Sequence, residues 1–294
     1  MPIVSLSDRA VLSVEGDDAE SFLAGIVTCA VDGAPAHFGA LLTPQGKIIV
    51  DFLLARRQDG HPGYLIDVPA GLADALLKRL TMYRLRAKVT LADRSGELGV
   101  AAGFGASPQM PAGAAVFADP RLADLGWRCI APKAALAGLA DAPADAYEAH
   151  RIGVAVPQGG RDFAYGDAFP HEAAMDQLGG VDFEKGCYVG QEVVSRTQHR
   201  GLARTRVAAL SFAGPAPAEG AEIRAGDKPI GRVGSVAAAQ GRAIGLLRLD
   251  RLAAALAAGH PLLAGEARLL AAKPGWAGYA FPELAVQESP GARA

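Results

Sequence analysis

Several side chains capable of chemistry lie together in residues 181–192, with sequence VDFEKGCYVGQE. Two glycines, Gly186 and Gly190, enclose a thiol and allow the backbone to turn tightly or to approach a ligand closely. A lysine next to a cysteine favours the thiolate, which is the nucleophilic and metal-binding form. We therefore predict that Cys187 and Lys185 act in catalysis and that the same site includes Gly186, Tyr188, Gly190 and Gln191.

The alternative for Cys187 is a packing role, because a free cysteine in an apolar setting is usually a small buried hydrophobe. Its neighbours argue against this, since Lys185, Tyr188 and Glu192 are charged or amphipathic. An ordinary core strand does not hold such residues together. The composition of the segment favours a functional cysteine.

Composition sets limits on partners. The chain has 294 residues, enough for two or three domains, with 29 basic and 31 acidic residues and a formal net charge of -2. This balance gives no overall attraction to nucleic acid or to an acidic membrane, so any such contact would need a local patch. We expect small-ligand binding or catalysis, with no direct nucleic-acid partner and no membrane partner.

The three cysteines are Cys29, Cys129 and Cys187, and their spacing matches neither a zinc site nor a C-x-x-C pair. We predict no metal site, a packing role for Cys29 and Cys129, and a reducing compartment. The N-terminal segment has no basic stretch followed by an apolar core, and its acidic residues are Asp8, Glu15, Asp17, Asp18 and Glu20, so no targeting pattern is expected. No apolar run reaches the roughly 20 residues of a membrane helix. The sequence predicts a soluble cytoplasmic protein.

Strands and helices interleave in the first part of the chain. Alternation and spacing predict strands at 10–14, 64–68, 87–91 and 98–102, helices at 19–23 and 70–80, a hairpin formed by 38–42 and 47–54, and a loop at 108–120. This order indicates an α+β fold with antiparallel sheets.

The later part of the chain has a different character. Short apolar runs at 207–212, 230–236 and 243–247 are separated by Gly- and Pro-rich connections, which predicts a small β-barrel. A helix at 249–258 interrupts the barrel, and 269–271 supplies a closing strand. The predicted division is 1–202, 203–286 for the barrel, and a disordered tail at 287–294.

Residues 185–192 (KGCYVGQE) resemble the signature of the YgfZ-type folate-binding proteins, which are relatives of the aminomethyltransferase (T-protein) of glycine cleavage. Further segments resemble the same family in order: 14–17 with 22–23 and Thr28, 42–47 with Asp51, 67–69, 83–86, and 151–153 with Pro157. The resemblance covers nearly the whole chain. It implies two intertwined modules with ferredoxin-like antiparallel sheets around a channel for tetrahydrofolate or a one-carbon-substituted folate, plus the C-terminal barrel.

The resemblance also implies roles for two carboxylates. Glu172 matches an acidic residue that binds the pterin ring, and a carboxylate can accept two hydrogen bonds from a pterin edge. Asp51 lies near the position of an aspartate close to the reacting nitrogen of the folate. Without the resemblance, Glu172 would be a solvated carboxylate at a helix start and Asp51 an exposed strand residue.

A basic run follows the signature, comprising Arg196, His199, Arg200, Arg204 and Arg206. Arg200 and its neighbours could bind the glutamate tail of a folate, contact a partner, or form a solvated face. No aromatic residue is interleaved, so RNA binding is the weakest of these interpretations. His171, next to Glu172, is expected at the surface.

The function that the resemblance implies is tetrahydrofolate binding in support of iron–sulfur cluster assembly or repair, with cluster-dependent tRNA modification downstream. Its partners would be folate and iron–sulfur assembly or client proteins. Whether it has an enzymatic activity is left open. The alternatives are a folate-dependent aminomethyl or methyl transferase and a scaffold without a working folate site.

Overall fold

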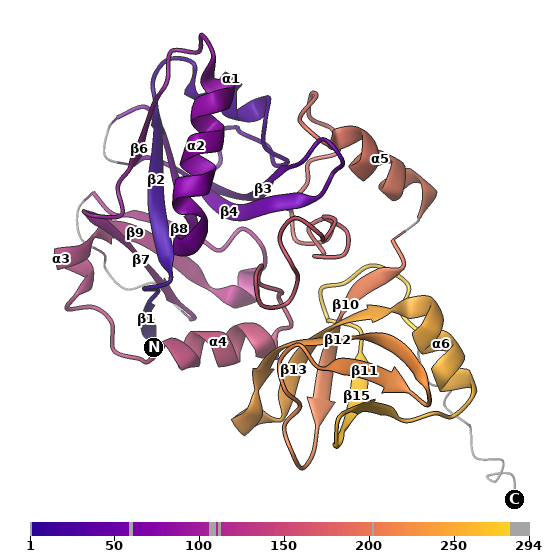
Figure 1. The fold of residues 1–294 in the computed structure, drawn as a ribbon. Helices are drawn as coiled ribbons and strands as arrows, with labels where there is room; N and C mark the ends of the chain where they lie inside the picture. Colours follow the sequence, from indigo (N-terminus) through magenta and orange to yellow (C-terminus); the bar gives the residue numbers. More distant parts are fainter. Residues whose placement is uncertain (1, 59–60, 106–109, 111–112, 202, 283–294) are drawn as a thin grey trace, which may run out of the picture.

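The computed structural model describes residues 2–58, 61–105, 110, 113–201 and 203–282. It contains two antiparallel sheets, a turn-rich connection and a closed barrel (Figure 1). The strands are β1 (Ile3–Ser5), β2 (Arg9–Glu15), β3 (Ala36–Leu42), β4 (Ile48–Arg56), β5 (Gly63–Pro69), β6 (Thr90–Asp93), β7 (Leu98–Gly103), β8 (Ala115–Ala118), β9 (Trp127–Pro132), β10 (Thr205–Phe212), β11 (Glu222–Ala225), β12 (Lys228–Ala237), β13 (Arg242–Arg248), β14 (Leu262–Ala264) and β15 (Ala267–Ala272). The helices are α1 (Ala19–Ala24), α2 (Ala73–Arg84), α3 (Lys133–Leu136), α4 (Ala144–Gly153), α5 (Gln191–Arg200) and α6 (Leu249–Ala257), with 3-10 turns η1 (Ala70–Leu72), η2 (Ala123–Leu125) and η3 (Ala238–Gln240).

The first sheet has the strand order β3-β4-β5-β2-β6 and is buried on both faces. Successive side chains of a strand point to opposite faces. Along β2, Leu12 and Val14 pack in the core that lies under α1 and α2, whereas Val11 packs in a second core shared with the other sheet. In α2 the buried residues Leu76 and Leu80 lie one turn apart, which puts them on the face that meets the sheet.

The second sheet has the order β1-β7-β9-β8 and contributes to the shared core. Its strands β7 and β9 pair in antiparallel register, with Val100 opposite Ile130. Helix α4 contributes Tyr147 and Ile152 to the same core. The space between the two sheets and α4 is where polar side chains from distant parts of the chain meet.

Residues 154–190 connect α4 to α5 mainly through turns. The connection is tied to the start of β4, because Ile48 N donates to Ala168 O at 3.0 Å and Gly166 N donates to Ile48 O at 2.7 Å. It is also tied to the barrel, where Ser235 N donates to Asp162 Oδ1 at 2.6 Å. This irregular segment therefore joins the sheets to the barrel.

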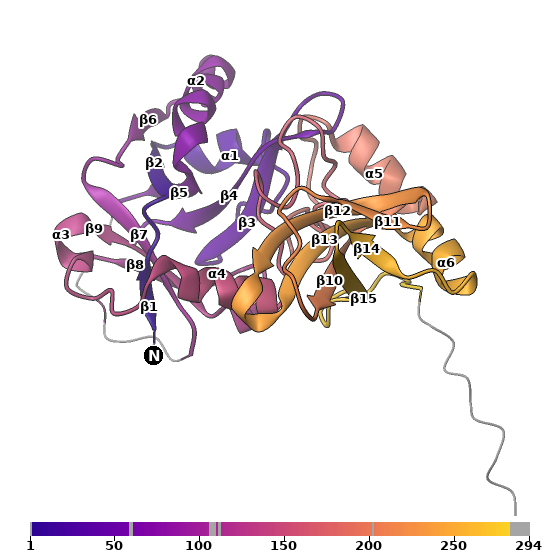
Figure 2. The ribbon, with the colours of Figure 1, turned by 60° about the horizontal axis from the view of Figure 1, so that its bottom comes forward.

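The barrel closes in the order β10-β13-β12-β11-β14-β15, with β15 paired back to β10. Its core is formed by small and branched side chains such as Ile223, Val233 and Leu247, and Leu252 of α6 covers it. Figure 2 shows α6 at one side of the barrel and α2 on the side of the molecule away from it.

The α+β architecture with antiparallel sheets and a C-terminal barrel is confirmed. Two local predictions need correction. Residues 108–120 do not form only a loop, because 115–118 are strand β8 next to β9. The strand predicted at 87–91 begins at Thr90 instead. The tail at 287–294 lies outside the described residues, and the domain limits at 202 and 286 stay predictions.

Candidate functional site

A cavity of about 200 Å³ lies between the two sheets and α4. Its walls include residues of β2, β4, β9 and α4 and of the turn-rich connection. Many of the lining side chains are charged or can form hydrogen bonds: Asp8, Arg9, Asp51, Arg121, Arg128, Tyr147, Glu148, Arg151, Gln158 and Arg161. The cavity therefore combines apolar walls with many charged groups, and the pairing of its arginines decides which charges are left to bind a ligand.

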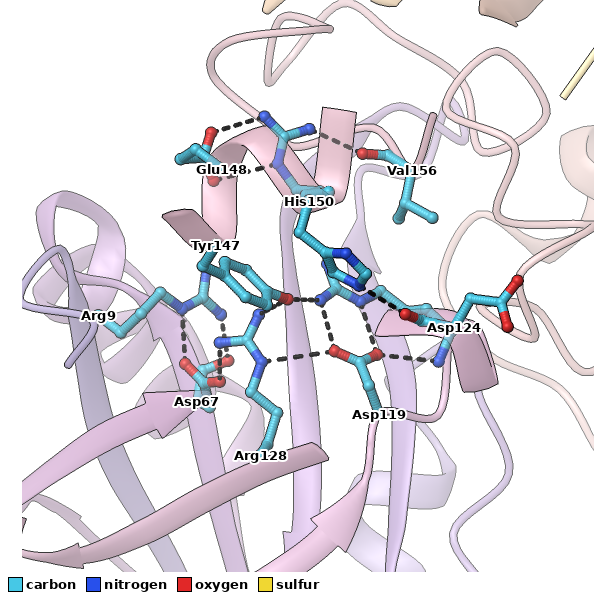
Figure 3. A network of polar contacts seen from close by, with 11 residues as sticks. Arg9, Asp67, Asp119, Asp124, Arg128, Tyr147, Glu148, His150 and Val156 are labelled. Carbon is cyan, nitrogen blue, oxygen red and sulfur yellow. Dashed lines mark hydrogen bonds and ion pairs between the residues drawn. The ribbon is translucent and has the colours of Figure 1, made fainter. Parts of the chain in front are cut away.

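On one side of the cavity, arginines and aspartates form a buried network (Figure 3). Asp67 is completely buried and lies between Arg9, at 2.6 Å, and Arg128, at 3.3 Å. Arg128 also forms an ion pair with Asp119 at 3.4 Å and donates a hydrogen bond to the Tyr147 hydroxyl at 3.1 Å. Arg9 and Arg128 are therefore already neutralised by carboxylates of the chain.

The remaining partner of Asp119 is Arg121, at 2.7 Å. Burial by itself would raise the pKa of Asp119, but the charges of Arg121 and Arg128 outweigh it and lower the pKa to about 2. Asp119 is therefore ionised at neutral pH and holds both arginines in place.

Arg151 forms a second network on α4 and is only 1% exposed. Its guanidinium donates to Asp162 Oδ2 at 2.9 Å, to Glu148 Oε2 at 2.8 Å and to Ser235 Oγ at 2.8 Å. Arg161 also contacts Glu148. Since Ser235 belongs to β12, this network connects the cavity wall to the barrel.

Asp51 differs from these carboxylates. It is 8% exposed, lines the cavity, and among the described residues it makes no ion pair. Its partner is the Tyr165 hydroxyl, which donates to Asp51 Oδ1. Burial and the adjacent Asp51 charge raise the pKa of Tyr165. The nearby charge of Arg121 interacts with Asp51 without a direct contact. The expectation that Asp51 without a folate role would be an exposed strand residue is therefore wrong about its exposure.

The signature segment lies outside this cavity. The Lys185 ammonium donates to Val27 O at 2.8 Å and to Cys29 O at 2.7 Å, which fastens the segment to the loop after α1. Burial lowers the pKa of Lys185. Cys187 is exposed, whereas Cys29 and Cys129 are buried, as their predicted packing roles require. Activation of Cys187 by Lys185 stays a prediction, because the structure directs the ammonium to two carbonyl oxygens.

The two glycines of the signature have different surroundings. Gly190 has φ +84° and precedes α5, and a Cβ placed on it would lie 2.5 Å from Thr43 O in the β3–β4 turn. The glycine is required by this close approach. A Cβ on Gly186 would meet no atom within 4 Å. Gln191, the first residue of α5, follows Gly190 directly.

Tyr188 lies next to Cys187 in sequence but is only 7% exposed. Its ring centroid is 5.5 Å from Lys185 Nζ, and its buried hydroxyl finds no hydrogen-bond partner within the described part of the chain. Burial raises the pKa of Tyr188 to about 12, so the phenol is neutral at physiological pH.

Glu172 is half-buried and does not line the cavity. Its carboxylate accepts from Phe169 N at 3.0 Å, so it caps its own turn. The predicted pterin contact of Glu172 stays a prediction. His171 was expected at the surface, but it is 1% exposed and its Nε2 lies 3.0 Å from Gln198 Oε1 of α5. The His171 ring also lies beside Phe183, with ring centroids 6.1 Å apart.

The basic run does not form one face. Arg206 is buried and pairs with Asp176 at 2.8 Å, while Arg196 pairs with Glu192 on the surface of α5. Arg200 is exposed near the end of α5 and does not line the cavity. Binding of a folate by Arg200 stays a prediction.

The described residues contain no group of three or more His, Cys, Asp or Glu side chains arranged to hold a metal ion. None of their helices is both long and apolar enough to cross a membrane.

The ion-pair network around Asp67 and Arg128 was not predicted from the sequence. Its signal was present, because Asp67 and Arg128 each interrupt a strongly apolar strand. A charged residue in such a strand is buried only if it is paired. The pattern could therefore have shown that these two residues face partners, although not which ones.

The fold is that of an aminomethyltransferase. Aminomethyltransferase T of the glycine cleavage system from Bartonella henselae superposes with a TM-score of 0.73, covering 96% of this chain and 88% of that chain, at 16% identity. A family model described as the CAF17 C-terminal beta-barrel domain matches residues 204–279, which contain the barrel strands.

Sequence relatives define the family more narrowly. The human mitochondrial iron–sulfur cluster assembly factor IBA57 is 36% identical over 73% of this chain and 67% of its own length. A Mycosarcoma maydis IBA57 homologue is 31% identical over 71% of this chain and 57% of its own length. The chain thus spans little more than half of the fungal relative. It belongs to the IBA57 family.

These relatives refine two predictions. The YgfZ-type proteins are a related family, and IBA57 is the more specific assignment. The predicted cytoplasmic location is contradicted, because these IBA57 relatives are named as mitochondrial proteins.

Proposed function

We propose that the chain is an iron–sulfur cluster assembly factor and that Cys187 contacts a cluster in transit or a redox partner. The human and fungal relatives are named as iron–sulfur cluster assembly factors. The observation that carries the proposal for this site is the exposure of Cys187 on a segment that is held at both ends. Lys185 fastens one end and Gly190 fits against the β3–β4 turn at the other.

This arrangement suits a thiolate that meets a large partner. Thiolates are preferred ligands of iron–sulfur clusters. Gly186 adds no side chain beside the sulfur and has open space around it, so a cluster or a partner protein can approach the backbone there. The anchored ends limit the conformational freedom that would be lost on binding.

The test is complementation of a strain that lacks the protein, with the activity of a cluster-dependent enzyme as the readout. Cys187→Ser is expected to lose most of the restored activity. Glu184→Gln changes another exposed side chain of the same segment; it serves as the matched control and should restore activity fully. Equal rescue by both variants would rule out a role for the thiol.

The proposal includes tetrahydrofolate binding in the cavity between the sheets. The arginines there are paired, which leaves Asp51 as the buried lining carboxylate that makes no ion pair among the described residues, whereas Asp8, also unpaired there, is exposed. A carboxylate in this state can accept hydrogen bonds from the N–H groups of an aminopyrimidine edge. Small-molecule pockets usually measure about 300–1,000 Å³. The cavity of about 200 Å³ therefore fits a ring system, while the rest of a folate would extend beyond it.

Calorimetric titration with tetrahydrofolate tests this part separately. We expect binding that Asp51→Asn weakens at least tenfold, because an amide presents only one acceptor oxygen where the carboxylate presents two. Glu172→Gln is the comparison variant, and a loss confined to it would move the pterin contact to Glu172. No binding by the parent protein would exclude the folate site and leave the role of Cys187 intact.

The second candidate is a folate-dependent aminomethyl or methyl transferase. The position of Asp51 at the cavity favours it, because such an enzyme needs a carboxylate near the reacting nitrogen. Turnover of a methylamine donor by purified protein with tetrahydrofolate, lost in Asp51→Asn, would establish it.

Effects on cluster-dependent tRNA modification belong to the assembly-factor proposal, and Cys187→Ser should abolish the support that the protein gives to this modification. The third possibility, a scaffold, predicts thermal stability that excess folate leaves unchanged.

A further inference from the structure

The end of α2 carries an exposed surface that is both apolar and cationic. Met82 is 75% exposed and Leu85 is 88% exposed, more than any other large apolar side chain of the described residues. Exposed basic residues surround them: Arg79, Arg84, Arg86 and Lys88. We call residues 79–88 the α2 tip.

The basic side chains of the α2 tip are free to bind a partner, because they are not paired within the described part of the chain. Among the described residues, Arg79, Arg84 and Arg86 make no side-chain hydrogen bond or ion pair, in contrast to the arginines of the cavity. The neighbouring turn before α1 contains Asp17 and Asp18, but Asp18 accepts from the backbone N of Lys88 at 2.7 Å and not from an arginine. The tip therefore keeps a local positive charge on a chain with a formal net charge of -2.

The backbone holds this shape. Leu85 directly follows α2 as its C-cap and has φ +43°, a conformation that a bulky residue rarely adopts. Hydrogen bonds from Ala87 N to Arg84 O, at 2.8 Å, and from Val89 N to Ala87 O, at 2.9 Å, close the turn. Val89 is buried and anchors it. Leu85 is thus held in solvent by a fixed and strained turn, which suggests that its exposure is used.

We propose that the α2 tip docks on the surface of an anionic lipid bilayer. The basic side chains would meet lipid phosphates, and Met82 and Leu85 would enter the boundary between headgroups and acyl chains. The long arginine stems can lie along the apolar layer while their guanidinium groups stay at the phosphates. A nucleic acid fits less well, because the exposed apolar side chains Met82 and Leu85 are not aromatic, and the aromatic residue of the tip, Tyr83, packs partly against the core under α2.

The position of the tip agrees with this role. Figures 1 and 2 place α2 on the side of the molecule away from the barrel, so the barrel does not cover it. The apolar side chains protrude instead of lining a groove. A bilayer accepts protruding side chains without a matching cavity, whereas a protein partner must supply one.

Sedimentation of the full chain with lipid vesicles tests the proposal. We expect binding to vesicles of phosphatidylcholine mixed with phosphatidylglycerol, little binding to phosphatidylcholine alone, and weaker binding as salt is added. Arg84→Gln with Arg86→Gln should lower the affinity about 10-fold or more and reduce the salt dependence. Leu85→Ser should lower the affinity and leave the salt dependence unchanged.

Leu270→Ser is the matched control, because Leu270 is 66% exposed on the barrel, away from the tip. It should bind vesicles like the parent. Circular dichroism checks that each surface variant is folded. The proposal is overturned if the parent does not bind anionic vesicles, if it binds neutral vesicles equally well, or if the Arg84, Arg86 and Leu85 variants bind like the parent.

Discussion

The cavity between the sheets and the segment around Cys187 use charged residues in opposite ways. In the cavity, arginines and carboxylates neutralise one another inside the protein, as Arg128 does between Asp67 and Asp119. In the Cys187 segment, the charged Lys185 fastens the backbone and the thiol is left in solvent. The cavity networks therefore hold the modules together, and the exposed segment offers chemistry to a partner.

We expect the buried ion pairs of the cavity to contribute mainly to stability and the exposed Cys187 segment to contribute mainly to function. Replacing one partner of a buried ion pair leaves a charge uncompensated and costs far more than losing an exposed pair. Replacing an exposed side chain on an anchored segment changes stability little. Changes in the network should thus act on folding, and changes at Cys187 should act on the interaction with a cluster or partner.

The largest expected contrast is in thiol reactivity. Burial raises the pKa of both Cys29 and Cys129 to about 12. Each pKa unit lowers the thiolate fraction about tenfold. In the native protein, alkylation by iodoacetamide followed by mass spectrometry should label the exposed Cys187 at least about tenfold faster than the other two thiols, whose burial both keeps the reagent away and disfavours the thiolate. Comparable labelling of Cys129 would contradict the burial that defines this contrast.

Asp67→Ala should cost about 3–5 kcal/mol in free energy of unfolding, because it removes the carboxylate that pairs with Arg9 and leaves the buried Arg128 with Asp119 alone. Urea denaturation measures the loss. Asp74→Ala is the control, since Asp74 pairs with Lys78 on the exposed face of α2 and should cost at most about 1 kcal/mol. Similar costs for the two variants would show that the network is not a stability element.

Acid should weaken the cavity network by protonating Asp119. The pKa of Asp119 is about 2 in the folded protein, below the ordinary value of about 3.9. A lowered folded-state pKa stabilises the protein above the unfolded pKa, and this stabilisation is lost as pH falls from about 4 towards 2. We expect Asp119 to contribute on the order of 2–3 kcal/mol to this loss. Denaturation curves of parent and Asp119→Asn measured across this range should converge at low pH.

The sequence predicts some levels of this structure better than others. Alternation along β2 and the leucine spacing of α2 depend on local periodicity, so those elements could be predicted. The exposure of Cys187 and the capping role of Glu172 depend on which distant segments pack against them. Lys185 meets carbonyl oxygens of the loop after α1, more than 150 residues earlier in the chain, and no local pattern specifies that contact.

The smallest contrast lies within the signature itself and compares its two glycines. Gly190→Ala places a Cβ 2.5 Å from Thr43 O at a φ of +84°, and should cost about 1–3 kcal/mol in free energy of unfolding. Gly186→Ala meets no atom within 4 Å, so its effect on stability should stay within about 0.5 kcal/mol. Urea denaturation compares the two variants directly. If Gly186→Ala is stable yet fails in complementation, a cluster or partner protein must occupy the open space beside Cys187. If it is stable and fully active, only Gly190 is needed, and its role is to hold the segment against the β3–β4 turn.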